Sequence, residues 1–267
     1  MAQVTLSGTF NVDVNKMPAA KTSVGMGDAI LSFTAKEDLG GGMAIAANTT
    51  VNTAAGRGSS AGANGYSFAL TGGFGGVTLK NYLTGNASLS AGVSATDDMS
   101  DVLGTYNTRT RVQYDFPTFA PGLTASLRYD ATAAATVTTG AGAVSTFDST
   151  KYAIGYAMGP VSVAVGGSTA TGVKNDFTVS YNAGIAKVSV WTQSGSNNEY
   201  TITAPVGAVN LGLHMINGDT AEATGFVASY ALSKRTTVSF NAVNITKSAN
   251  SVVATGTNTR VRMSHTF

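Results

Sequence analysis

The chain has 267 residues, including 32 glycines and no cysteine, and its net charge at neutral pH is +2. Charged residues make up 11% of it, against roughly 25% in ordinary soluble domains. The lack of cysteine excludes disulfide scaffolds and cysteine-based metal sites or catalysis. The near-neutral charge, without any run of Lys and Arg, argues against a nucleic-acid partner.

The first residues, Met1 to Val4, lead directly into an alternating segment. They contain neither the basic stretch nor the apolar stretch of a secretory signal, so we expect no signal peptide here and interpret the sequence as a mature form. No apolar run in the chain approaches the ~20 residues that a membrane-spanning helix needs. A membrane-facing surface would have to come from strands, in which only every second residue faces lipid.

Alternation with a period of two residues dominates the chain and predicts β-strands. In the first segment, Val4, Leu6 and Phe10 alternate with Thr5 and Thr9. Further segments of the same kind begin near Leu31, Met43, Tyr66, Val77, Val112, Leu123, Tyr152, Val161, Phe177, Val188, Tyr200, Val209, Phe226, Val238 and Val261. The sequence therefore predicts an all-β fold, a transmembrane antiparallel β-barrel of about 16 strands, an even number as bacterial barrels require.

Short glycine-rich turns and longer polar stretches connect these segments. Tight turns are expected at 40–42, 72–76, 159–160, 183–184, 205–207 and 233–234, where glycine can supply a positive φ. Longer polar stretches lie at about 14–28, 53–64, 131–150 and 246–257, and the longest connection runs from about Leu83 to Thr108. No linker or change in composition divides the chain, so we predict one domain over residues 1–267.

The last segment has two different sides. Val261, Met263 and Phe267 lie on one side, and Arg262 and Ser264 lie on the other. A strand that closes a membrane barrel has this pattern, with its apolar side toward lipid and its polar side toward a water-filled lumen. A secreted all-β adhesin or sandwich is the alternative, but aromatic residues near strand ends and few Lys/Glu pairs on the polar sides favour the membrane barrel.

Strand parity places a set of charged side chains on the inner face of the predicted barrel. The set consists of Lys80, Arg109, Arg111, Arg128, Arg260 and Arg262, together with Asp13, Asp115 and Asp130. Charged groups on a pore wall select ions, so these residues are candidates for lining a pore. Structural roles stay open: Arg260 and Arg262 could neutralise Asp13 across the closing strand, and Arg109 and Arg111 could pair with aspartates of the longest connection.

The two histidines give no sign of a metal or catalytic site. We expect His214 to face the lumen and His265 to face lipid near an interface. Neither has metal-like spacing, nor an obvious partner serine and acid by strand parity, so we predict no metal, no cofactor and no enzymatic activity. Trp191, the only tryptophan, has inward parity. It either fills space at the barrel rim or offers a stacking surface for a sugar.

Several segments resemble the Gram-negative porin family, in particular the proteobacterial general porins. Lys36-Glu37-Asp38-Leu39-Gly40-Gly41-Gly42 is similar to that family's acidic pair and glycine turn after the second strand. Tyr230-Ala231-Leu232-Ser233-Lys234-Arg235-Thr236-Thr237 is similar to its hairpin before the closing strand. Val261 to Phe267 is similar to its terminal strand, and the opening Val4 to Gly8 fits as well. The matches occur in the family's order along nearly the whole chain.

The resemblance implies a 16-stranded homotrimer in the lipid of the bacterial outer membrane, with a long third extracellular loop folded into the lumen. That loop would be residues 83–108, and its Asp97, Asp98 and Asp101 would face the basic wall at a constriction. Ile30 and Thr34 stand where the family often has basic residues, so part of the usual basic lining is missing.

The function that the resemblance implies is passive diffusion of small hydrophilic solutes and ions, with weak charge selectivity. Two alternatives stay open. One is a substrate-specific channel in which Trp191 and the arginines form a binding track. The other is a barrel that serves as a structural or adhesive surface protein.

Overall fold

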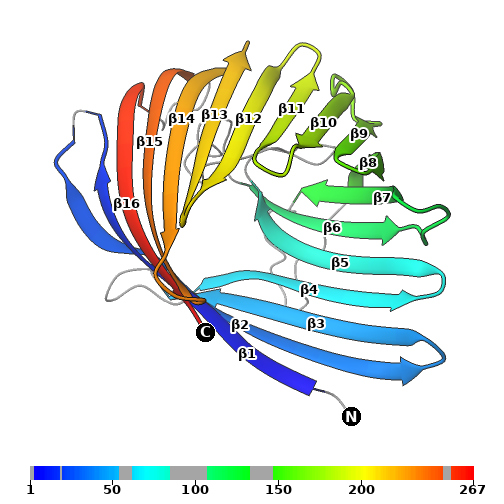
Figure 1. Cartoon of the computed structure of the whole chain (residues 1–267). Coiled ribbons are helices and arrows are strands. Elements are labelled where there is room, and N and C mark those ends of the chain that lie inside the picture. The colour runs from blue at the N-terminus through cyan, green and yellow to red at the C-terminus, as the bar shows by residue number, and fades with distance from the viewer. Residues whose placement is uncertain (1–2, 19, 54–61, 85–106, 133–146, 249–253) are drawn as a thin grey trace.

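A computed structural model describes residues 3–18, 20–53, 62–84, 107–132, 147–248 and 254–267. Within these residues the chain forms sixteen strands arranged in a ring (Figure 1). The strands are β1 (Gln3–Lys16), β2 (Ser23–Gly40), β3 (Met43–Asn52), β4 (Gly62–Gly72), β5 (Gly75–Thr84), β6 (Asn107–Asp115), β7 (Leu123–Thr132), β8 (Phe147–Met158), β9 (Val161–Ser168), β10 (Asp176–Asn182), β11 (Lys187–Gln193), β12 (Asn197–Val206), β13 (Val209–Gly218), β14 (Ala221–Ala231), β15 (Thr236–Ser248) and β16 (Gly256–Thr266).

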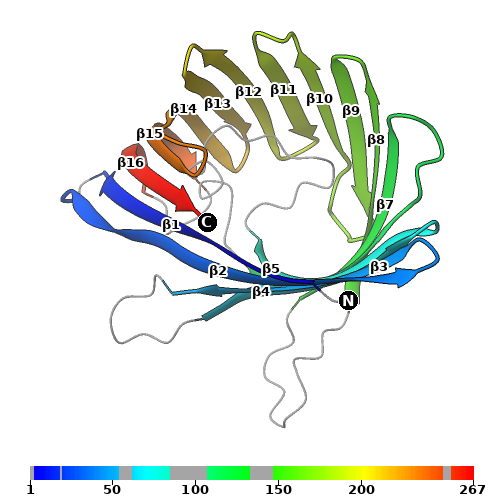
Figure 2. The ribbon, with the colours of Figure 1, turned by 60° about the horizontal axis from the view of Figure 1, so that its bottom comes forward.

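Each strand pairs antiparallel with the strands that precede and follow it in the chain, and β16 pairs with β1. The sheet is therefore a closed barrel without an open edge, which confirms the predicted fold class. Figure 2 shows the ring from a second direction, with the C-terminus beside β1. Among the described residues, no helix is long and apolar enough to cross a membrane.

The seam between β1 and β16 is held by the last residue of the chain. Phe267 and Gly8 exchange two backbone hydrogen bonds of 3.1 Å. The Phe267 ring lies over Gly8, where an added Cβ would come within 2.5 Å of it, and stacks on Phe10 at 5.8 Å between ring centroids. Gly8 is thus required for the aromatic ring to cover the seam, and the predicted closing role of the last strand is confirmed.

The tight turns gather at one rim, because each joins an even-numbered strand to the next odd-numbered strand. The predicted turns between 40 and 234 all lie at this rim. Gly40, Gly41 and Gly42 have φ values of 78°, 60° and 77°, a left-handed conformation that glycine adopts without a steric penalty.

The opposite rim is less regular than the sequence predicts. The connections at 194–196 and 219–220 are short. At the second, the Asn197 carboxamide oxygen accepts hydrogen bonds from the backbone N–H groups of Thr220 and Ala221 at 3.2 and 3.1 Å. The polar stretch expected at 14–28 is largely strand, since β1 and β2 stay paired as far as Asn15 and Ser23. Most of the predicted 83–108 loop lies outside the described residues.

The alternation places apolar side chains on the outside of the barrel, where Val4, Leu6, Ile154, Val188 and Met263 are all exposed. An apolar outer band with a polar interior is the arrangement of a membrane barrel.

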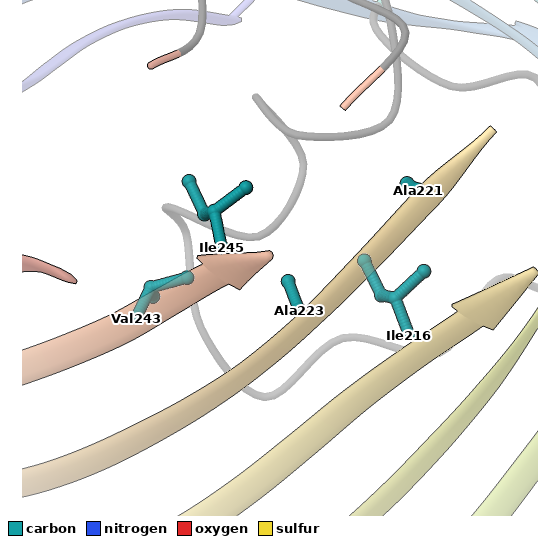
Figure 3. Close-up of a cluster of buried hydrophobic side chains, with 5 residues drawn as sticks. All are labelled: Ile216, Ala221, Ala223, Val243 and Ile245. Atoms are coloured by element: carbon teal, nitrogen blue, oxygen red, sulfur yellow. The ribbon is translucent and has the colours of Figure 1, made fainter. Parts of the chain in front are cut away.

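The inner face also holds an apolar cluster that the alternation does not predict. Ile216 of β13, Ala221 and Ala223 of β14, and Val243 and Ile245 of β15 project from the same side of three neighbouring strands (Figure 3). Val243 is 0% exposed and Ile245 is 2% exposed. Because cross-strand neighbours on one face remove each other from water, the side chains in this part of the inner wall pack together and are not exposed to solvent.

Candidate functional site

Four basic side chains form a patch on the inner wall of β5–β8. Lys80 of β5 pairs in register with Arg111 of β6, and Arg128 of β7 pairs with Lys151 of β8. Residues paired across strands share one face of a sheet at about 4.5–5.5 Å between Cβ atoms. The structure thus brings together three of the predicted lining residues, Lys80, Arg111 and Arg128, on one wall.

Asp130 of β7 lies at the centre of this patch and neutralises part of it. Arg111 donates to it through Nε at 2.6 Å and through Nη2 at 3.1 Å, and Lys151 donates through Nζ at 2.8 Å. The Asp130 side chain is 1% exposed. A two-point arginine fork and a second cation satisfy the buried carboxylate, an arrangement that fixes geometry as well as charge.

Lys151 was not among the predicted lining residues, although the sequence contains the signal. Tyr152 and Ile154 face outward, so Lys151 must face inward by parity. The described carboxylate partner of Arg111 is Asp130. The alternative pairing with Asp97, Asp98 or Asp101 concerns residues outside the described part of the chain.

Neutralisation of Asp13 across the closing strand, one of the roles left open for Arg260 and Arg262, is the role that the structure shows for Arg262. Arg262 of β16 donates to the Asp13 carboxylate through Nε at 2.7 Å and Nη2 at 2.8 Å. The pair needs a glycine beside it, because a Cβ at Gly27 would lie 2.2 Å from Asp13 Oδ2. Arg260 faces the same side and pairs in register with Asn15 of β1 and Asn241 of β15.

A different wall, β9–β12, is lined mainly by hydroxyl groups. Ser162, Ser180, Ser189 and Thr201 lie directly opposite one another on four successive strands. Ser180 Oγ donates to Ser189 Oγ at 2.8 Å. These hydroxyl groups can donate and accept hydrogen bonds without carrying charge.

Trp191 faces inward as parity predicts, but it is only 2% exposed. Its indole Nε1 donates to Asp176 Oδ2 at 3.1 Å. An indole buried to this extent has no free face for a sugar to stack on, so the space-filling interpretation of Trp191 is the one that the structure supports.

Two further pairs on this side were not anticipated from the sequence. His214 faces inward as predicted, and its Nε2 lies 3.2 Å from Glu199 Oε2 in a buried pair. Asp176 is the buried partner of Trp191. Parity alone could not show either pair, since both join strands whose relative register is not readable from alternation. His265 lies on the outer face, exposed, with Nδ1 2.9 Å from Thr236 Oγ1.

Four predicted site residues cannot be placed. Asp97, Asp98 and Asp101 lie outside the described residues, and only the backbone of Arg109 is described, at the start of β6. Among the described side chains, no group of three His, Cys, Asp or Glu residues could hold a metal ion.

A family model described as Gram-negative porin matches residues 1–250 of the chain. No curated protein matches the chain.

Solved porin structures resemble the barrel over its full length. The anion-selective porin from Comamonas acidovorans is 22% identical, with a TM-score of 0.66 and 100% of each chain covered. OmpF from Salmonella typhi, in a complex with daunomycin, is 12% identical, with a TM-score of 0.71, and the match covers 100% of this chain and 97% of that one. OmpT from Vibrio cholerae, described as a trimer form, is 14% identical, with a TM-score of 0.66, covering 100% and 99%. At these identities the likeness shows the fold.

Proposed function

Since this chain belongs to the Gram-negative porin family and is an outer-membrane porin channel, we propose that it passes small hydrophilic solutes and ions by passive diffusion, with weak charge selectivity. One observation carries the proposal: a closed ring of sixteen strands with apolar side chains on the outside and, apart from the apolar cluster on β13–β15, mainly charged or hydroxyl-bearing side chains on the inside. Barrels of 16–18 strands leave an aqueous channel inside.

The charges on two of the inner walls support a proposal for the sign of the selectivity. Among the described side chains of β5–β8, four are basic and two, Asp115 and Asp130, are acidic, which is a net charge of +2. On β10–β13, Asp176 and Glu199 stand against Lys187, a net charge of −1 with His214 neutral. We propose a weak preference for anions, the property named for the Comamonas acidovorans porin.

The proposal also gives roles to individual charged residues of the pore. Arg109, Arg260 and Arg262 would add to the basic lining, and Asp97, Asp98 and Asp101 would oppose it with negative charge at a constriction. The neutralising contacts of Asp130 and Asp13 reduce the field of the basic groups, which supports weak rather than strong selectivity.

Planar-bilayer recording tests the channel and its selectivity together. We expect stepwise conductance in KCl and, in a salt gradient, a reversal potential on the anion side. No conductance would overturn the channel and favour a structural or adhesive surface barrel. Conductance with a reversal potential on the cation side would keep the channel and overturn the proposed sign.

We also propose a homotrimer, as the OmpT structure is described. Residues 1–52 and 236–267 contain no tyrosine or tryptophan, and they form the adjacent strands β15, β16, β1, β2 and β3. Exposed tyrosines occur on other strands, at Tyr66, Tyr129, Tyr152, Tyr156, Tyr181, Tyr200 and Tyr230. Because tyrosine and tryptophan mark lipid–water boundaries, the wall without them is the one that we propose other copies cover.

Spin labels test this contact surface, and the absence of native cysteine makes single labels simple. A label at Val12→Cys on β1 should show lower accessibility to lipid-dissolved oxygen than a label at Ile154→Cys on β8. Both positions are exposed in the isolated barrel. Equal accessibility, or a monomer mass in detergent, would overturn the trimer.

A further inference from the structure

A recess of about 360 Å³ opens on the inner wall between β7 and β12. Its polar lining includes Ser162, Thr178, Ser180, Ser189, Thr201 and Lys187. The volume lies within the range of small-molecule sites. None of the predicted pore-lining residues whose side chains the structure describes contributes to the recess, so it is distinct from the basic patch of β5–β8.

The hydroxyl groups of the recess form a regular row. Ser162 of β9 lies opposite Ser180 of β10, which lies opposite Ser189 of β11, and Ser189 lies opposite Thr201 of β12. Neighbouring strands are about 4.8 Å apart, and within the row Ser180 Oγ and Ser189 Oγ lie closer, at 2.8 Å, because they are hydrogen-bonded to each other. The row therefore presents a hydroxyl group on each of four successive strands.

One buried polar group beside the β12 end of this row has no hydrogen-bond partner among the described residues. Thr201 lines the recess and is 7% exposed. On the next strand, His214 lies opposite Thr201, and its buried Nδ1 lacks a partner within the described part of the chain. Buried polar groups are normally satisfied, so His214 Nδ1 marks a place next to the recess where a ligand or ordered water supplies the missing hydrogen bond.

We propose that this recess binds small, neutral, polyhydroxylated solutes of about monosaccharide size. Each serine or threonine hydroxyl can both donate and accept, which matches a ligand that carries many hydroxyls. Among the described residues that line the recess, the one cation is Lys187, which is exposed. An ion would lose its hydration without a buried opposite charge in return, whereas a polyol exchanges one set of neutral hydrogen bonds for another.

The inference rests on the proposed function, because only an open, water-filled lumen lets a solute reach the recess. Recognition depends on the hydroxyl row alone, since Trp191 beside it is buried and hydrogen-bonded to Asp176. Binding of this kind is weak and leaves the solute free to pass on.

The test measures glucose flux into proteoliposomes that contain the purified protein, alongside KCl conductance in planar bilayers. The triple variant Ser180→Ala, Ser189→Ala, Thr201→Val removes the row with little change in volume. Ala164→Leu fills the recess by volume and keeps every hydroxyl, since Ala164 also lines it. The matched control is Ser7→Ala with Ser32→Ala, a serine pair opposed across β1 and β2 on the same inner face.

We expect wild-type glucose flux to saturate with concentration. Both recess variants should lose that saturation, and their flux at low concentration should fall about three- to tenfold, the loss of one or two neutral hydrogen bonds. KCl conductance should not change, which also shows that the variants fold, and the control should behave as wild type. Linear glucose flux in the wild type, or an unchanged triple variant, would overturn the recess alone. Absence of KCl conductance in the wild type would overturn the proposed pore as well.

Discussion

The walls formed by β5–β8 and by β9–β12 belong to one sheet and follow one alternation, yet they present different chemistry to the lumen. On β5–β8, Lys80, Arg111, Arg128 and Lys151 surround the buried Asp130. On β9–β12, a row of serine and threonine hydroxyls takes the same inward positions. The first wall is held by charge pairs, whereas the hydroxyl row of the second wall contains a neutral hydrogen bond between Ser180 and Ser189.

The difference between the two walls shows that facing the lumen and exposing a charge to the solute are separate properties of a side chain. Parity decides that a side chain faces the lumen, but the residue opposite it on the next strand decides whether its charge reaches the solute. Arg111 and Lys151 share one carboxylate, so they contribute less to the pore potential than their number suggests. On the hydroxyl wall, Asp176 is paired with Trp191 and Glu199 with His214, and the serine and threonine hydroxyls carry no charge.

The largest expected effect comes from removing the centre of the charged wall. Asp130→Asn should lower the free energy of unfolding by about 3–5 kcal/mol, because it leaves the Arg111 and Lys151 cations close together without a carboxylate. Urea unfolding in lipid vesicles at pH 7 measures this difference.

Asp115→Asn is the matched control on the same wall. Asp115 accepts a hydrogen bond from Gln113 at 2.7 Å, and it is more exposed than Asp130. A neutral amide there should change stability by less than about 1 kcal/mol, as for exposed charges. If both variants lost the same stability, the charged wall would not depend on Asp130 in the way its contacts indicate.

The second prediction concerns the ion pair at the seam between β1 and β16, and asks whether it stabilises the barrel as the charge pairs of β5–β8 do. Gly27→Ala should lower the free energy of unfolding by about 1.5–3 kcal/mol, the value of hydrogen bonds to charged groups. The added Cβ would lie 2.2 Å from Asp13 Oδ2 and would push the carboxylate away from Arg262.

Gly25→Ala provides a close control for the seam, because nothing lies within 4 Å of a Cβ added there. It should leave the urea midpoint nearly unchanged. An equal loss in both variants would mean that backbone freedom in β2, and not space for the ion pair, explains the glycine at position 27.

The sequence predicts the barrel well because period-two alternation is a property of each strand alone. The closing strand, the rim of tight turns and the inward positions of Lys80, Arg111, Arg128 and Arg262 all follow from it. The Asp13–Arg262 pair was also foreseeable, since the first and last strands of a closed barrel must meet.

The chemistry between strands was much less predictable. Pairs such as Trp191–Asp176 and His214–Glu199 depend on the register of neighbouring strands. Bulges shift that register, as between Thr50 and Val51. The extra residue of a bulge cannot be recognised from the alternation of apolar and polar residues. The inward apolar cluster around Ile245 was missed for a related reason, because polarity at one position does not reveal how three strands pack together.

A third prediction sharpens the interpretation of the hydroxyl wall. Trp191→Phe should lower the free energy of unfolding by at least about 1 kcal/mol, because it removes one hydrogen bond to Asp176, and the smaller ring leaves part of the buried space unfilled. As the only tryptophan, Trp191 reports its own surroundings by fluorescence. Its emission should be blue-shifted and should not change when glucose is added. Quenching or a shift by glucose would restore the stacking role and contradict the burial of the ring.

The smallest expected effect is on ion selectivity, and it addresses the comparison most directly. Lys80→Gln and Arg128→Gln each remove one charge from the β5–β8 wall without removing a partner of Asp130. A unit charge about 8 Å from an ion in water is worth roughly 0.5 kcal/mol before screening, so each variant should lower the anion-to-cation permeability ratio about twofold. Reversal potentials in a KCl gradient measure the ratio, and Arg128→Lys should preserve it.

Lys187→Gln on the hydroxyl wall is the comparison variant, since Lys187 is exposed at the rim of tight turns. An equal shift of the reversal potential by Lys187→Gln would mean that ion selectivity depends on the total charge of the pore. The β5–β8 wall would then have no special role in ion selectivity.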